Sequence, residues 1–131
     1  MRKIYTTGGW LHYPPLEFYY MQGEINVEPV QFVLPKTREE VDLTALSYQI
    51  KAVSEDYGTE AAWILPKRTS EEHILLDWEI TREFTLMPGR VMLTLTGTDT
   101  KNNVVAKWTG NPAIIRKDPQ GTQPVPPPDK L

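Results

Sequence analysis

Residues 73–95 constrain the fold more than any other stretch, because hydrophobic and polar side chains alternate there with a period of two. This alternation is typical of a β-strand with one face on a hydrophobic core. The residues expected to face inward are Ile74, Leu76, Trp78, Ile80, Val91, Leu93 and Leu95. Met87-Pro88-Gly89 lies between the two halves, and Pro followed by Gly is typical of a turn. The segment therefore predicts a β-hairpin at the centre of the core.

Shorter alternating runs occupy much of the remaining chain, and Trp63 and Trp108 fall on the inward positions of two of them. Residues 36–44 and 66–72 are polar and predict loops, and the turn at 54–59 predicts a positive φ at Gly58. About seven to nine short strands at regular spacing, without a convincing helix, are typical of a sandwich. We therefore expect an all-β, immunoglobulin-like antiparallel β-sandwich.

The composition changes near both ends of the chain. Residues 1–22 predict an extended N-terminal arm with a first strand, and residues 23–117 predict the β-sandwich domain. Residues 118–131 contain five prolines and few aliphatic side chains. Such a segment cannot build a core, so we expect a flexible, Pro-rich C-terminal tail.

The predicted arm is rich in aromatic residues, and these are the candidate interface residues: Tyr5, Trp10, Tyr13, Phe18, Tyr19 and Tyr20. Gly8-Gly9 and Pro14-Pro15 interrupt any regular element. The rings could cap the domain's own core, lie on a neighbouring subunit, or form a platform for sugars. Aromatic residues dominate interface anchors, so we expect residues 1–15 to lie on another subunit, with Trp10 and Tyr13 as anchors.

Charge and cysteine content exclude several classes of partner and site. The net charge is −3, and neither sign forms a long run, which argues against nucleic acid as a partner. The chain has no cysteine, so disulfides and thiolate metal sites are excluded. No stretch reaches the roughly 18–20 apolar residues of a membrane span. The N-terminus lacks the apolar region of a signal peptide.

Residues with catalytic or metal-binding chemistry are sparse and dispersed. The two histidines, His12 and His73, have no thiolates or further histidines near them in the sequence to complete a zinc site. Asp77 and Glu79 share one strand face, and we interpret them as a solvated outer surface. The 99–103 segment lacks the ligand spacing of a calcium loop. We therefore predict no catalytic, cofactor or metal site, and no enzymatic activity.

Five short motifs follow one another along the chain: V-D-L at 41–43, I-L-L-D-W-E-I at 74–80, P-G at 88–89, K-W-T at 107–109 and N-P-A at 111–113. In the order of these motifs, the chain resembles the N-terminal domain of phage baseplate upper proteins and related small β-sandwich modules of phage virions. The resemblance covers residues 24–117.

The resemblance implies a structural role in a virion assembled in the host cytoplasm. The expected function is a non-enzymatic adaptor or attachment module of the tail or baseplate. A capsid decoration or head-fibre protein is one alternative, and a carbohydrate-binding module is another. The expected partners are other virion proteins and copies of the chain itself, whereas glycan binding has no support beyond the aromatic arm.

Overall fold

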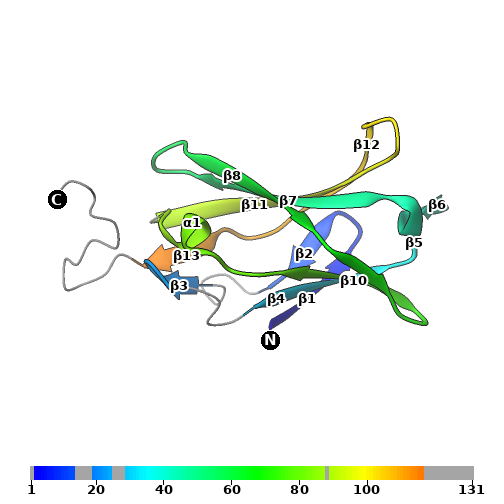
Figure 1. Ribbon diagram of the computed structural model, residues 1–131, viewed down its shortest axis with the longest axis horizontal. Coiled ribbons are helices and arrows are strands. Elements are labelled where there is room, and N and C mark those ends of the chain that lie inside the picture. The colour runs from blue at the N-terminus through cyan, green and yellow to red at the C-terminus, as the bar shows by residue number, and fades with distance from the viewer. Residues whose placement is uncertain (1, 14–18, 25–28, 88, 117–131) are drawn as a thin grey trace.

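A computed structural model describes residues 2–13, 19–24, 29–87 and 89–116, and most of them lie in β-strands (Figure 1). The strands are β1 (Arg2–Thr7), β2 (Trp10–His12), β3 (Tyr19–Met21), β4 (Val30–Pro35), β5 (Thr37–Arg38), β6 (Val41–Asp42), β7 (Ser47–Ser54), β8 (Glu60–Leu65), β9 (Lys67–Thr69), β10 (His73–Trp78), β11 (Gly89–Thr98), β12 (Val104–Thr109) and β13 (Ala113–Arg116). A 3-10 turn, Leu43–Ala45, precedes β7, and one short helix, α1 (Arg82–Thr85), precedes β11. None of the helices in these residues is long and apolar enough to cross a membrane.

The strands form two layers with the core between them (Figure 1). One layer contains β8, β7, β11 and β12 in that order, and β13 pairs with β11 beside the start of that strand. The other layer contains β2, β1, β4, β10 and β9. The layers join where Thr109 of β12 pairs with Trp10 of β2.

A second junction lies at Pro66, which alone separates β8 from β9. The chain pairs with β7 before this proline and with β10 after it, so one bent strand belongs to both layers (Figure 1). Proline has no N–H to donate to a ladder, which is why it marks the change of partner. The Lys67 ammonium then donates to the Thr44 and Leu46 carbonyls at 2.6 and 2.8 Å. The strand pairings therefore form a ring with its corner at Pro66.

The prediction of a β protein is confirmed in its coarse form, since the described residues are mostly strand, but the large sheet is mixed and is not the expected antiparallel sandwich. Among the described residues, three strand pairs are parallel: β1 with β4, β2 with β12, and β3 with β13. Sequential hairpins would give only antiparallel neighbours. The parallel pairs arise because β1, β2 and β3 each pair with a strand that does not follow directly in the sequence.

The predicted central hairpin is also replaced by a different connection. β10 pairs with β4 and β9, whereas β11 pairs with β7, β12 and β13, so the two strands lie in opposite layers. The connection contains α1, whose Phe84 is fully buried. Period-two alternation identifies a half-buried strand without identifying its neighbour. The segment from Glu79 to Met87 is too long for a tight hairpin turn, and it carries the chain across the core.

Both layers contribute the residues of the core. Those predicted to face inward are buried at Ile74, Leu76, Trp78, Ile80, Val91, Leu93, Leu95 and Trp108, while Trp63 is half-buried. Trp78 lies at the centre, with its ring centroid 4.9 Å from Phe84 and 5.5 Å from Trp63. Phe32 of β4 stacks on Trp78 at 6.2 Å. An aromatic cluster therefore fills the space between the layers.

Residues 2–13 form part of this core and not an arm. The Gly8-Gly9 pair, which predicted a break, forms the turn of a β1–β2 hairpin, with Gly8 at φ +58°. Ile4 and Leu11 point inward and are fully buried. Glycine in a two-residue turn permits the backbone twist that such hairpins need. The predicted Pro-rich tail, by contrast, lies outside the described residues.

We expect Trp78→Ala to lower the free energy of unfolding by about 3–5 kcal/mol, because the substitution leaves a cavity among three other aromatic rings. Urea denaturation measures this change. Ile64→Ala is the control, since Ile64 is 76% exposed and its loss should cost no more than about 0.5 kcal/mol. Similar losses for the two variants would contradict the observed packing.

We also expect Ile4→Asp to unfold the domain, whereas Lys3→Asp should leave it folded. Ile4 is fully buried and its neighbour Lys3 is exposed on the same strand, so only the first change buries a charge. Near-ultraviolet circular dichroism and thermal melting distinguish the two variants. A folded, stable Ile4→Asp protein would show that β1 is dispensable to the domain.

Candidate functional site

A groove at one end of the molecule is the first candidate site. Its volume is about 320 Å³, and its lining residues are Arg38, Glu39, Val41, Leu43, Val105, Ala106 and Lys107. One wall is the β5–β6 hairpin and the other is β12. We call this cavity the valine groove, because Val41 and Val105 line it and are each 39% exposed. Val104 next to it is 53% exposed.

The β5–β6 hairpin occupies part of the segment that the sequence predicted to be a loop. Its turn consists of Glu39 and Glu40, which have φ angles of +49° and +71°. Positive φ is uncommon for residues other than glycine and strains the backbone. The hairpin begins directly after β4, and its turn projects two carboxylates from the end of the molecule.

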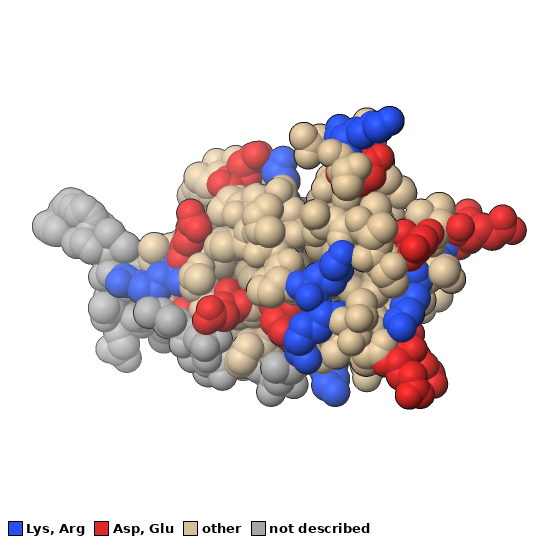
Figure 2. All heavy atoms as spheres, turned by 45° about the vertical axis from the view of Figure 1, so that its right-hand side comes forward, with Lys and Arg blue, Asp and Glu red and all other residues tan. Residues whose placement is uncertain are grey.

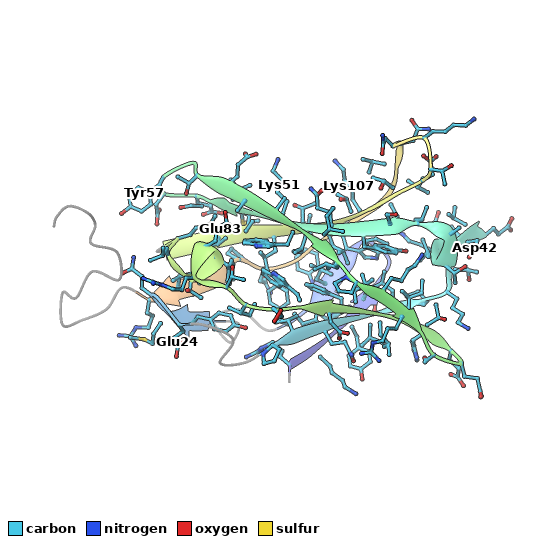
Figure 3. All side chains as sticks on the ribbon, viewed as in Figure 1. Glu24, Asp42, Lys51, Tyr57, Glu83 and Lys107 are labelled. Carbon is cyan, nitrogen blue, oxygen red and sulfur yellow. The ribbon has the colours of Figure 1, made fainter. Side chains whose placement is uncertain are left out.

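Asp42 fixes the base of this hairpin and lies at the same end of the molecule (Figure 3). Its carboxylate accepts hydrogen bonds from the Thr44 hydroxyl at 2.6 Å and from the Thr44 backbone N–H at 2.9 Å. These bonds, together with the positive charge of Lys67, hold the pKa of Asp42 below its usual value. Nearby, the Tyr48 hydroxyl donates to the Leu43 carbonyl at 2.6 Å, and burial raises the pKa of Tyr48.

Arg38 attaches the hairpin to β12. Its guanidinium donates to the Lys107 carbonyl at 3.0 Å and lies 5.4 Å from the centre of the Trp108 ring. A guanidinium over an indole face adds a cation–π attraction to the hydrogen bond. The groove is therefore a built feature with one wall held in place against the other.

The register of β12 is irregular beside this groove. Its pairing with β11 shifts between Gly97 and Thr98, so that Val105 has no partner there. A bulge of this kind turns side chains away from the regular alternation and discourages further strand pairing. It explains why Val104 and Val105 are both exposed, and why this edge does not favour another strand.

The outer face of the β2-β1-β4-β10-β9 layer is the second candidate site. We call its exposed ring residues, Tyr5 and Trp10, together with His12, the aromatic face. Tyr5 is 52% exposed and Trp10 is 42% exposed. Tyr5 lies opposite His12 in the β1–β2 pair, and Trp10 lies opposite Thr7. The three side chains therefore share one face of the hairpin.

A polar network lies on the same outer face. The Asp77 carboxylate accepts two hydrogen bonds at 3.0 and 3.2 Å from the terminal nitrogen of Arg68, and a third at 3.2 Å from its Nε. The Gln31 amide donates to Asp77 at 3.0 Å. Asp77 is therefore a paired residue. The sequence reading of a simply solvated carboxylate missed both partners, because Gln31 lies on the distant strand β4 and Arg68, although close in sequence, lies in a segment that was expected to be a loop.

The six aromatic residues predicted as an interface lie in different environments. Tyr5 and Trp10 are exposed, whereas Tyr13 and Tyr20 are buried in the core with exposures of 5% and 3%. Tyr20 packs edge-on against Phe84 at 5.8 Å, and burial raises the pKa of Tyr13. The backbone of Tyr19 pairs with Ile114. Phe18 lies outside the described residues. Tyr13 therefore cannot act as the predicted interface anchor, because it packs within the domain itself.

The described residues contain no group of three histidine, aspartate or glutamate side chains that could hold a metal ion. Asp99 accepts hydrogen bonds from the backbone N–H groups of Lys101 and Asn103 at 2.9 Å each. These bonds lower the pKa of Asp99 and build the β11–β12 turn. Asn102 in this turn has a φ angle of +65°.

A shallower hollow lies at the opposite end of the molecule, where Tyr57 and Glu83 are found (Figure 3). Thr59, Leu86 and Met87 complete its lining, and its volume is about 470 Å³.

Acidic and basic side chains are interspersed over the side of the molecule that Figure 2 shows. That mixture gives neither a basic stripe for nucleic acid nor a wholly acidic face on this side.

No protein-family model matches the chain, and no curated protein matches it either. The residues of the two candidate surfaces are therefore what point to a function.

We expect Asp42→Asn to make stability less sensitive to acid. The folded-state pKa of Asp42 is lowered, so its contribution to stability is present above the unfolded-state pKa of about 3.9 and is lost as the pH falls through the folded value. Urea denaturation between pH 6 and pH 2 should show a shallower decline for the variant. Glu71→Gln, on the β9–β10 turn, is the control. Equal declines for Asp42→Asn and the parent would contradict this role.

Proposed function

We propose that this chain is a non-enzymatic structural protein of a bacteriophage virion, an adaptor or attachment module of the tail or baseplate. Its partners are other virion proteins and copies of itself. A capsid decoration or head-fibre role is the alternative location within the particle. The observation that carries the proposal is the valine groove, a concave site with exposed valines at one end of a mostly-β domain.

The placement of the family-like motifs supports the proposal. V-D-L ends at Leu43, which is fully buried, and the D-W and K-W-T motifs contribute the buried Trp78 and Trp108. In N-P-A, the Asn111 amide donates to the Tyr13 carbonyl at 3.1 Å. The motifs that resemble phage virion modules are thus the residues on which the framework of this domain depends.

The surface chemistry of the valine groove supports an attachment role. Val41, Val104 and Val105 are exposed around a concave site that also contains Arg38 and Lys107. Apolar surface rimmed by charged groups is typical of protein interaction sites. The Arg38 contacts hold the hairpin wall in place, so little ordering entropy is lost when a partner binds.

The test is whether the protein belongs to the particle. Particles of the phage that encodes this chain, purified by density gradient, should contain the protein in a fixed ratio to the major structural proteins. Mass spectrometry measures that ratio, and antibody labelling in electron microscopy distinguishes the tail from the capsid. Particles without the protein would overturn the proposal.

We expect Val105→Glu to give a folded protein that is lost from particles. The substitution would replace an apolar contact with a carboxylate that must be desolvated against the partner, and should lower incorporation about tenfold. Ile64→Glu is the control, because Ile64 is an exposed apolar residue of β8 outside the groove. Equal incorporation of the two variants would show that the groove is not the attachment surface.

A further inference from the structure

The aromatic face extends into a continuous row of side chains across five strands. His12 lies opposite Tyr5, Tyr5 opposite Val33, Val33 opposite Leu75, and Leu75 opposite Arg68. Neighbouring strands are about 4.8 Å apart, so the row spans roughly 19 Å. Trp10 adds a ring beside one end of this row, and Asp77 adds a carboxylate beside the other.

The two exposed rings are held on a rigid support. β1 pairs on both sides, with β2 and with β4, and the Thr109 N–H donates to the Gly9 carbonyl at 3.0 Å just before Trp10. Tyrosine and tryptophan each have two side-chain torsions, so a fixed backbone leaves them few positions. A ligand that stacks on them would therefore lose little conformational entropy from the protein.

The polar end of the row is also preorganised. Arg68 and Gln31 hold the Asp77 carboxylate from two sides, at distances from 3.0 to 3.2 Å. The Arg68 and Asp77 side chains remain 57% and 35% exposed. Guanidinium, amide and carboxylate groups in fixed positions offer both donors and acceptors to a ligand. Hydroxyl groups match them, because each hydroxyl can donate and accept.

The apolar surface between these ends is largely covered. Val33 faces outward but is only 5% exposed, and Leu75 is half-buried. The exposed apolar surface of the row is thus concentrated in the rings and does not form a wide aliphatic patch. A protein partner would favour a continuous apolar centre. A saccharide chain, with C–H faces and hydroxyl edges, matches a row that has exposed rings at one end and fixed polar groups at the other.

The charges of this face favour an uncharged ligand. The ion pair between Arg68 and Asp77 neutralises both groups. Lys3 is an exposed cation in register with Gln31. Glu79, which follows β10 on the same alternation as Asp77, is an exposed anion, so neither sign of charge dominates the described outward residues of this face.

We propose that the aromatic face and the Asp77 network bind an uncharged polysaccharide, with Tyr5 and Trp10 stacking on sugar rings and Asp77, Arg68 and Gln31 bonding to hydroxyls. Tyr13 and Tyr20 take no part, because they are buried. This site lies on a different surface from the valine groove. Loss of polysaccharide binding and loss of particle incorporation are therefore separable outcomes.

Affinity electrophoresis in gels containing soluble neutral polysaccharides tests the proposal. The panel is a β-1,3-glucan, a β-1,4-glucan derivative, an α-glucan, a mannan and a galactan. At least one should retard the parent protein, and Trp10→Ala and Tyr5→Ala should each weaken that retardation about tenfold. Asp77→Asn should weaken it without unfolding the protein. Tyr57→Ala is the matched control, because Tyr57 is an exposed tyrosine, 67% accessible, on the β7–β8 turn.

Tryptophan fluorescence provides an independent measurement. Trp10 is exposed, Trp63 is half-buried, and Trp78 and Trp108 are buried, so acrylamide should quench Trp10 most strongly. Saturating polysaccharide should reduce that quenching in the parent and not in Trp10→Ala. Absence of retardation by the whole panel would overturn the proposal. So would unchanged binding by Trp10→Ala, or a change in molar mass by light scattering in Trp10→Ala, which would identify the face as a protein interface.

Discussion

The contact between Trp78 and the rings around it is the interaction on which the rest of this structure depends. Phe32 comes from β4, Trp63 from β8 and Phe84 from α1. The centroids of these three rings lie between 4.9 and 6.2 Å from the Trp78 ring centroid. These rings belong to both layers and to the connection between them. Large aromatic side chains dominate core energetics, and offset or edge-on pairs add to the burial itself. The cluster therefore sets how far apart the layers lie and how they are connected.

The two candidate surfaces are supported in different ways. The aromatic face lies on the outer side of strands whose inner side packs on the cluster, so its rings share the stability of the core. The valine groove has a different support, since a short hairpin forms one wall and Arg38 ties it to β12. One end of the molecule thus presents a small concave site, while the outer side of a layer presents a flat one.

The sequence predicted secondary structure well where side chains alternate, and predicted strand neighbours poorly. Ile74, Leu76 and Trp78 are buried as their period-two pattern indicates. The same pattern contains no signal for which strand pairs with which, so the connection through α1 and the parallel pairs were missed. Gly8-Gly9 was interpreted as a break because glycines interrupt regular elements, but a glycine pair also suits a tight hairpin turn.

The candidate surfaces were predictable only in part. Tyr5 and Trp10 were identified from aromatic content, although nothing in that content separates them from the buried Tyr13. The alternation around Ile4 and Leu11 could have separated the exposed rings from the buried ones. It places Tyr5 and Trp10 on the outward side and indicates that residues 2–12 form strands of the domain. The valine groove and the Gln31–Asp77 contact depend on residues far apart in the chain, and no local pattern encodes them.

The parallel pairing of β2 with β12 has a consequence for synthesis. Trp10 leaves the ribosome well before its partner Thr109 is made, because the two paired residues lie far apart in the sequence. The ring of strands therefore cannot close until β12 has been translated, and until then Ile4 and Leu11 of the β1–β2 hairpin stay uncovered on one side. Folds with such distant pairings form slowly, because a long loop must be ordered before its contacts repay the entropy. In a rapidly producing cell, the pace of elongation and the availability of chaperones would govern the yield of this domain as much as its final stability does.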